Sequence, residues 1–412
     1  MQISKWVALG VAAFCLVAVG GIVNLAQLYY MAAMLITLPL VSYAIGRWML
    51  RGLEFERQFV SPIWEGEEAE IIYRVTNPSR IPRFSISILT PDQSYLKSVR
   101  MEPPLFHVGA FGTTTVTNVV RFDRRGVFES GQFEVSAVDP LGVFTFTRTV
   151  AADGEIVVFP SVRPLDPMEL SGSHKLGMND AVAQARLGSG VDPAGVRGYL
   201  PGDPLRSIHW RQTARTGNLV VIEFEETQSA NLSIILDTTA RAIVGEEPDT
   251  TLEFAIRAAA SAARDAVQHG AVVALAARRQ DGSLSSASTG SGLDRGAGQL
   301  YPILDSLARI EAQADTSFAA LLLDKMGSAM PGATHLLIML TADAEVAGAV
   351  RRWIASGRSV AVLAIDANTF PGAARVDAET HQASLGQIAA MGVPVYTLPY
   401  NPQGALIISR VA

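Results

Sequence analysis

Two apolar runs open the chain, and they constrain its fold most, because an apolar run of about 20 residues is long enough to cross a membrane as a helix. The first run extends from Trp6 to Val23 and the second from Leu28 to Met49, with Asn24 to Gln27 between them. A second run directly after the first, with no clear small-x-small cleavage site, argues against a cleaved signal peptide. Aromatic residues stand near the run ends, as in interfacial belts: Trp6, Tyr29, Tyr30 and Trp48. The sequence therefore predicts a two-helix transmembrane hairpin over residues 1–52.

Positive charge predicts the orientation of this hairpin. Lys5 flanks one end, Arg47, Arg51 and Arg57 flank the other, and the loop between the runs carries no charge. Short loops rich in Lys and Arg stay on the cytoplasmic side. We therefore expect a protein of the inner cell membrane whose soluble part is cytoplasmic. A mean hydropathy of +0.25 agrees with a membrane segment.

Composition excludes several functions. A net charge of −6 gives no electrostatic basis for nucleic-acid binding. The single cysteine, Cys15, lies in the first apolar run, so it supplies neither an intrachain disulfide nor a nucleophile in a soluble domain. The chain has no Walker A motif and no G-x-S-x-G elbow, and its six histidines lack metal-ligand spacing. We find no complete catalytic constellation and expect no catalytic residues and no enzyme activity.

Residues 53–162 alternate short β-rich stretches with turns. Glu70 to Thr76 and Thr113 to Phe122 are rich in β-branched and aromatic residues, while Asn77 to Ser79 and Asp139 to Gly142 are turn sequences. Strands at this spacing predict an antiparallel β-sandwich of the immunoglobulin or fibronectin kind.

Residues 163–228 are expected to form a linker followed by a chemically dense stretch. Arg163 to Gly195 is polar and rich in Gly, Ser and Pro, with a short helix expected at Asn179 to Leu187. The dense stretch runs from Val196 to Glu226 and begins with a Pro-Gly turn. In it, Asp203 is placed to cap a short helix, and a strand follows from Leu219.

Residues 229–412 alternate strands with helices. Leu232 to Asp237 reads as a buried strand ending in a carboxylate, and Thr250 to His269 reads as an Ala-rich helix stopped by Gly270. Further pairs follow to the C-terminus. This rhythm predicts a doubly wound α/β domain with a parallel sheet.

The dense stretch resembles the signature of the domain of unknown function 58 family, a set of bacterial membrane-anchored proteins. The family pattern is a basic-aromatic-Pro-Gly-Asp run, then Ile, an acidic residue and Trp, then Ala-Arg-Thr-Gly. The matching residues are Arg197, Tyr199, Pro201, Gly202, Asp203, Arg206, Ile208, Trp210, Ala214, Arg215, Thr216 and Gly217. Gly198 stands where the family usually has Glu, and His209 where it has Asp, so roles of those two acids do not carry over.

The charged and aromatic residues of this signature admit two interpretations. Mixed charge with Arg and Trp is typical of a hot spot for a protein partner, and equally of a rigid internal ion-pair latch. The residues concerned are Arg197, Asp203, Arg206, Trp210, Arg211 and Arg215.

The strand end at Asp237 resembles the start of a von Willebrand factor A domain, where an Asp-x-Ser-x-Ser pattern binds a divalent cation. Asp237 and Thr239 match this pattern, but Arg241 replaces the last hydroxyl. A guanidinium opposes a cation, although Asp343 after a later strand could offer another oxygen. We expect a degenerate site that is not occupied, no cofactor, and at most weak Mg²⁺ binding.

These resemblances imply a scaffold or interaction protein that works beside a MoxR-type AAA+ ATPase, often with a transglutaminase-like membrane protein encoded nearby. The alternative is a metal-assisted hydrolase that uses Asp237 and the signature acids. The absence of a complete ligand set or nucleophile favours the scaffold.

Overall fold

The structure of the chain is a computed structural model. In it the chain forms two compact units, Met1–Ser161 and Val162–Ala412. The described residues are 2–60, 62–89, 96–98, 104–129, 131–152, 154–166, 168–170, 174–176, 187–199, 208–225, 231–278, 284–288, 300–312, 317–330, 332–372, 378–401 and 405–411. Each unit is considered by itself below.

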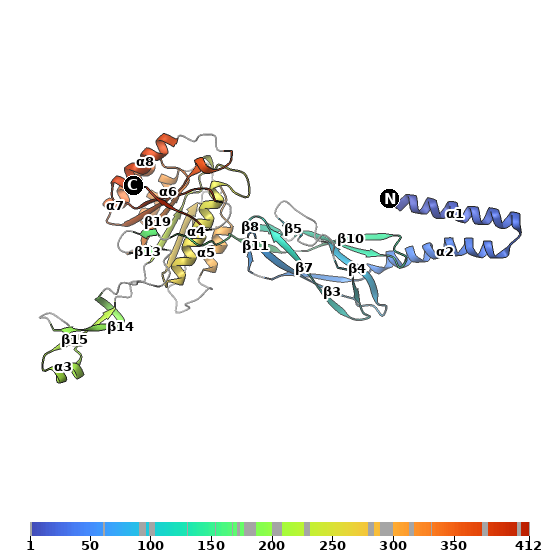
Figure 1. Ribbon diagram of the computed structural model, residues 1–412, viewed down its shortest axis with the longest axis horizontal. Helices are drawn as coiled ribbons and strands as arrows, with labels where there is room; N and C mark the ends of the chain where they lie inside the picture. Colours follow the sequence, from blue (N-terminus) through green and yellow to red (C-terminus); the bar gives the residue numbers. More distant parts are fainter. Residues whose placement is uncertain are drawn as a thin grey trace. The chain divides into compact units, whose positions relative to one another are not determined.

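The first unit begins with two helices that run side by side, α1 (Gln2–Val23) and α2 (Ala26–Met49) (Figure 1). The chain reverses at Asn24, whose φ of 57° is a left-handed conformation that Asn tolerates better than most residues. Among the described residues, α2 alone is long and apolar enough to cross a membrane, and Gly10–Val23 forms a shorter apolar helix. The predicted apolar N-terminal helix is confirmed, while a hairpin crossing the membrane twice stays a prediction.

Eleven strands follow among the described residues of the first unit. They are β1 (Glu54–Phe59), β2 (Ile63–Trp64), β3 (Glu68–Thr76), β4 (Arg83–Leu89), β5 (Leu96–Ser98), β6 (Phe106–Val108), β7 (Thr113–Phe122), β8 (Gly126–Glu129), β9 (Gln132–Val138), β10 (Thr145–Ala151) and β11 (Glu155–Phe159). Two four-stranded antiparallel sheets have the orders β1-β3-β7-β5 and β10-β9-β4-β6, and a three-stranded sheet has the order β2-β11-β8.

The two four-stranded sheets share one apolar core. Along β3 every second side chain is buried, as expected for a strand with one face against a core. Tyr73 of β3 meets Phe133 of β9 at a ring-centroid distance of 5.0 Å, which joins the sheets across this core. The predicted antiparallel sheets are therefore present, and their assignment to the immunoglobulin or fibronectin kind stays a prediction.

The second unit opens with strands and one short helix. These are β12 (Met168–Leu170), β13 (His174–Leu176), β14 (Leu187–Gly198), α3 (Trp210–Thr216) and β15 (Val220–Glu225). β12 pairs with β13, and β14 pairs with β15, both antiparallel. The sequence did not predict β12, β13 or the part of β14 before Val196. In β14, Gly and Pro lower the local strand propensity, and the partner strand β15 begins more than 20 residues later. Most of the helix expected at Asn179 to Leu187 lies outside the described residues, and Leu187 itself begins β14.

The rest of the second unit is an α/β layer structure. Its elements are β16 (Leu232–Leu236), η2 (Ala240–Ala242), α4 (Thr251–Gln268), β17 (Val273–Arg278), β18 (Leu284–Ser288), α5 (Tyr301–Ala308), α6 (Phe318–Met326), β19 (Thr334–Met339), α7 (Ala344–Ala355), β20 (Ser359–Ile365), η4 (Ala367–Thr369), α8 (Ala378–Ala390), β21 (Val395–Leu398) and β22 (Ser409–Arg410).

One seven-stranded sheet organises these elements, with the order β18-β17-β16-β19-β20-β21-β22. The five inner strands are parallel, and β18 and β22 are antiparallel edges. The order reverses between β16 and β19, so this is the switch point at which doubly wound sheets bind ligands. Every residue of β16 and β19 is buried, as expected for central strands covered on both faces.

Candidate functional site

The carboxylate of Asp237 lies at the switch point, and both of its oxygens accept hydrogen bonds. Asp237 is only 1% exposed. Its Oδ1 accepts from the backbone N–H of Thr239 at 3.0 Å and from the Thr239 hydroxyl at 2.7 Å. Its Oδ2 accepts from the backbone N–H of Leu340 at 3.1 Å. The side chain therefore joins the end of β16 to the end of β19.

Burial and hydrogen bonding act on Asp237 in opposite directions. Burial raises the pKa of the Asp237 carboxyl, and the hydrogen bonds from Thr239 and Leu340 offset part of that increase. Donors already surround the carboxylate, so it has less capacity to coordinate a cation.

The other residues of the expected cation site have different contacts. Arg241 lies in η2 with an exposed side chain. Asp343 caps α7, since its Oδ1 accepts from the backbone N–H of Val346 at 2.8 Å. Within the described part of the chain, no group of three or more His, Cys, Asp or Glu residues could hold a metal ion. The expectation that no cation binds at Asp237 and Thr239 stays a prediction.

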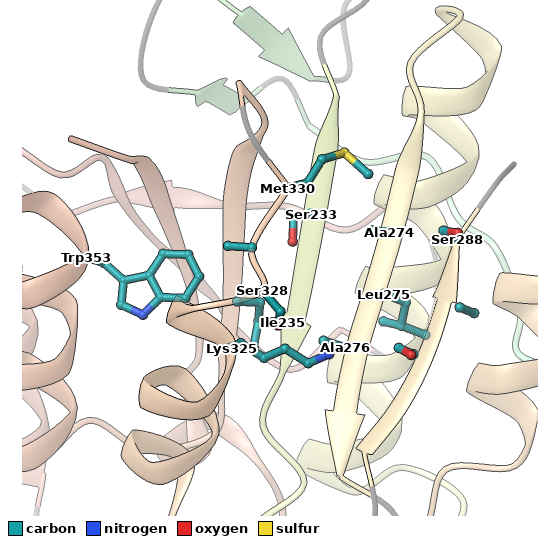
Figure 2. A pocket seen from close by; sticks show the side chains of 13 residues that line it. Ser233, Ile235, Ala274, Leu275, Ala276, Ser288, Lys325, Ser328, Met330 and Trp353 are labelled. Atoms are coloured by element: carbon teal, nitrogen blue, oxygen red, sulfur yellow. The ribbon is translucent and has the colours of Figure 1, made fainter. Parts of the chain in front are cut away.

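A cavity of about 450 Å³ lies over β16, β17 and β18 (Figure 2). Small side chains form most of its wall, and Lys325 extends from α6 toward Ala276 of β17. The lining residues are Ser233, Ile235, Ala274, Leu275, Ala276, Ser286, Ala287, Ser288, Lys325, Ser328, Ala329, Met330 and Trp353. No carboxylate or histidine is among them, so this cavity has no acid–base pair.

The signature residues are arranged around the β14–β15 hairpin. Arg197 pairs in register with Val221, and the backbone N–H of Tyr199 donates to Leu219 at 2.9 Å. Ile208 is buried and forms an isolated bridge with Val221. The hairpin thus fixes the segment on both sides of α3.

The short helix α3 has a defined start and end. His209 is its N-cap, and the Nδ1 atom accepts from the backbone N–H of Gln212 at 3.1 Å. Gly217 ends it with a φ of +73°, the left-handed conformation in which Gly carries no Cβ penalty. His209, one of the two residues that depart from the family pattern, therefore has the capping role that an Asp performs.

The outer surface of α3 is exposed. Trp210 is 66% exposed, although an indole ring of this size usually finds apolar cover. Arg211 and Arg215 are also exposed, and no residue of α3 is buried.

Some signature residues cannot be placed. Pro201, Gly202, Asp203 and Arg206 lie outside the described residues, and for Arg197 the backbone alone is described. The structure brings together Tyr199, Ile208, Trp210, Arg215 and Gly217, all in the β14–α3–β15 segment.

The residues that form this segment are also those that a family model matches. The model of "Protein of unknown function DUF58" matches residues 195–328, which include the hairpin, α3 and part of the α/β layer. This part of the chain is therefore similar to the DUF58 family. The "Uncharacterized protein YeaD" of Bacillus subtilis (strain 168) is 27% identical over 113 residues, which are 27% of this chain and 28% of that protein.

Two solved structures show low similarity to this chain. A "von Willebrand factor type A" structure from Catenulispora acidiphila gives a TM-score of 0.28 at 16% identity, over 43% of this chain and 40% of that one. A "FixG-related protein" from Vibrio parahaemolyticus gives a TM-score of 0.18 at 7% identity, over 26% of this chain and 98% of that one. Scores of this size carry no conclusion about function.

A second polar cluster, which the sequence did not indicate, lies between α2 and the β sheets. Asp139 is buried, accepts from the Ser42 hydroxyl of α2, and accepts from the backbone N–H of Phe144 at 2.5 Å. Burial by itself raises the pKa of the Asp139 carboxyl, but the bonds from Ser42, Phe144 and Leu141 outweigh burial and lower it. The two partners are 97 residues apart, so no local motif could have revealed them.

Proposed function

We propose that this chain is a membrane-anchored, cytoplasm-facing scaffold whose α3 surface binds a protein partner. The observation that carries the proposal is the exposure of Trp210 on a helix that is capped at both ends. Trp and Arg are the residues most enriched in interface hot spots. An exposed Trp210 beside Arg211 favours the hot-spot interpretation over an internal ion-pair latch.

The anchor in this proposal is the apolar N-terminal region. The helix α2 exposes a series of large apolar side chains that water solvates poorly, among them Tyr30, Met34 and Val41. A bilayer provides the apolar surroundings that such a surface needs. The arginines that follow α2 favour a cytoplasmic location for the rest of the chain.

The partner that the family resemblance suggests is a MoxR-type AAA+ ATPase, with a transglutaminase-like membrane protein as a second expected neighbour. We propose a binding role without catalysis for this chain. In support, Asp237 already accepts three hydrogen bonds, and Asp343 is used as a helix cap.

The direct test is binding of a purified MoxR-type ATPase from the same genome to the full-length chain in detergent. We expect Trp210→Ala to weaken binding by at least tenfold, because truncation of a hot-spot residue costs about 2 kcal/mol or more. Tyr301→Ala is the matched control, since it removes another exposed ring from a helix of the same unit.

Equal binding of the wild-type chain, Trp210→Ala and Tyr301→Ala would remove α3 from the interface. No binding by the wild-type chain would reject this partner. A change in the melting temperature of Trp210→Ala is not expected, because the exposed ring contributes little buried area.

A further inference from the structure

The C-terminal part of α2 is packed against the β sheets of its own unit. Ser42, Gly46 and Met49 are buried there. A Cβ atom at Gly46 would lie 2.5 Å from the ring of Phe146 in β10, so the helix and this strand approach as closely as Gly allows. The helix end is therefore held in a fixed position.

Arginines from the β sheets donate to carbonyls in the last turn of this helix and in the turn that follows it. Arg83 donates from Nη1 to the carbonyl of Trp48 and from Nη2 to that of Arg51, each at 3.2 Å. Arg148 donates from Nη1 to the carbonyl of Leu50 at 3.3 Å. Guanidinium groups at this end also complement the negative end of the helix dipole.

A basic cavity of about 360 Å³ lies at this junction. Its lining residues are Arg47, Leu50, Arg51, Gly52, Phe146, Thr147 and Arg148. The three arginine side chains are exposed, and no carboxylate is among the lining residues. Cations gathered without a carboxylate repel one another, so an anion that enters the cavity is favoured.

The position of the cavity along α2 indicates where the anion comes from. Ala26 to Tyr43 would extend about 27 Å at the helical rise, which is close to the thickness of the hydrocarbon core. Along the same axis Arg47 lies roughly 8 Å beyond Ser42, and Arg51 follows directly after the C-cap of the helix. In a membrane these arginines fall in the headgroup layer.

The surroundings of Ser42 agree with this depth. The backbone N–H of Leu141, in the β9–β10 turn, donates to the Ser42 hydroxyl at 3.3 Å, and the Leu141 side chain is exposed. Tyr43 packs edge-on against Phe146, with the ring centroids 5.1 Å apart. Exposed leucine and tyrosine side chains at one level are typical of a membrane interface.

We propose that this cavity binds the phosphate headgroup of an anionic phospholipid, an inference that rests on the proposed membrane anchorage of α2. Guanidinium groups match phosphate oxygens in a bidentate fashion, and basic groups next to a membrane helix attract anionic lipids. Leu50 and Phe146 provide apolar wall beside the arginines, which suits a lipid better than a free phosphate ion.

The experiment uses the purified full-length chain in an uncharged detergent. Native mass spectrometry compares adducts of phosphatidylglycerol with those of phosphatidylcholine of the same acyl chains. We expect the wild-type chain to prefer phosphatidylglycerol, and Arg51→Gln with Arg148→Gln to weaken that binding about 25-fold, at roughly fivefold per charge.

The matched control is the pair Arg74→Gln and Arg121→Gln, which removes two exposed charges from β3 and β7 of the same unit. Arg51→Gln alone leaves the junction hydrogen bonds in place, because Arg51 contributes its backbone carbonyl to them, and should lose about fivefold. This variant keeps the test valid should the Arg148 substitution loosen the junction.

Equal binding of the two lipids, or wild-type binding by the Arg51 and Arg148 double variant, would overturn the proposal. Displacement of phosphatidylglycerol by millimolar inorganic phosphate would assign the cavity to a soluble anion and overturn the lipid assignment. Alkaline carbonate extraction of membranes tests the anchor separately. If the chain resists extraction but shows no lipid preference, the membrane anchor is supported and the lipid-binding cavity is rejected.

Discussion

His209 shows how a single residue can depart from a family pattern and keep its structural role. The family usually places Asp here, and Asp caps a helix through a carboxylate oxygen. The imidazole of His209 accepts the same kind of backbone hydrogen bond through Nδ1. In that contact Nδ1 is the acceptor, in the place of a carboxylate oxygen of an Asp cap.

His335 leads to a prediction about pH. Burial, with a smaller effect from Arg358, lowers the pKa of this histidine to about 4. In the unfolded chain the pKa of this histidine is near 6.5, so at pH values between about 4 and 6.5 the unfolded chain binds more protons than the folded chain. The stability of the fold therefore falls as the pH drops through this range. We expect this residue to lower the free energy of unfolding by about 2 kcal/mol between pH 7.5 and pH 5.

Denaturant unfolding of the full-length chain in detergent at these two pH values measures this loss. His335→Leu should remove about 2 kcal/mol of the difference, because Leu does not titrate and fills the position beside Trp353. An equal pH difference in the wild-type chain and in His335→Leu would show that His335 is not the group responsible. His381, whose pKa is lowered mainly by burial, acts in the same direction and remains present in both proteins.

At the scale of elements, Arg83 is predicted to hold α2 on the β sheets. Its guanidinium carbon lies 3.1 Å from the centroid of the Trp48 ring, and the side chain is buried. Burial lowers the pKa of this arginine. Arg83→Met should therefore destabilise the chain by about 3 kcal/mol, because the carbonyls of Trp48 and Arg51 lose a charged donor. Thermal unfolding checks this, with Arg74→Met expected to cost under about 0.5 kcal/mol as an exposed control.

The elements that the sequence predicted are those with a strong local pattern. Buried strands such as β16 and the Ala-rich α4 agree with prediction, because their apolar residues follow the period of the element. The short helix α6 and the Gly-containing strand β14 were missed. A helix of nine residues gives little periodic signal, and β14 depends on pairing with β15.

The candidate site was predictable only in part. The Asp237 carboxylate at a strand end could be located from the sequence, and so could the signature segment. The bond between Asp237 and Leu340, which uses the second carboxylate oxygen, joins residues 103 positions apart. The exposure of Trp210 also depends on tertiary packing, so the hot spot and the internal latch could not be separated from sequence.

At the scale of the whole molecule, the length of the two N-terminal helices determines on which side of a membrane the chain ends lie. With 22 and 24 residues, α1 and α2 each reach beyond about 30 Å at the helical rise, and among the described residues α2 alone is also long and apolar enough to cross a membrane. Two crossings return the chain to the side on which it began, whereas one crossing places the ends on opposite sides.

The last prediction is that both ends of the chain are cytoplasmic. Lys5, Arg47 and Arg51 flank the helices, and the turn between them carries no charge, so the turn is the part that crosses to the far side. Alkaline phosphatase, which is active only outside the cytoplasm, should be inactive when fused to either end, and a cytoplasmic reporter should be active at both. Phosphatase activity at the C-terminus alone would mean that the chain crosses the membrane once. Phosphatase activity at both ends would mean that the hairpin has the inverted orientation. Three lysines inserted after Asn24 serve as the positive control, because positive charge in the turn opposes its translocation and should raise phosphatase activity at the ends.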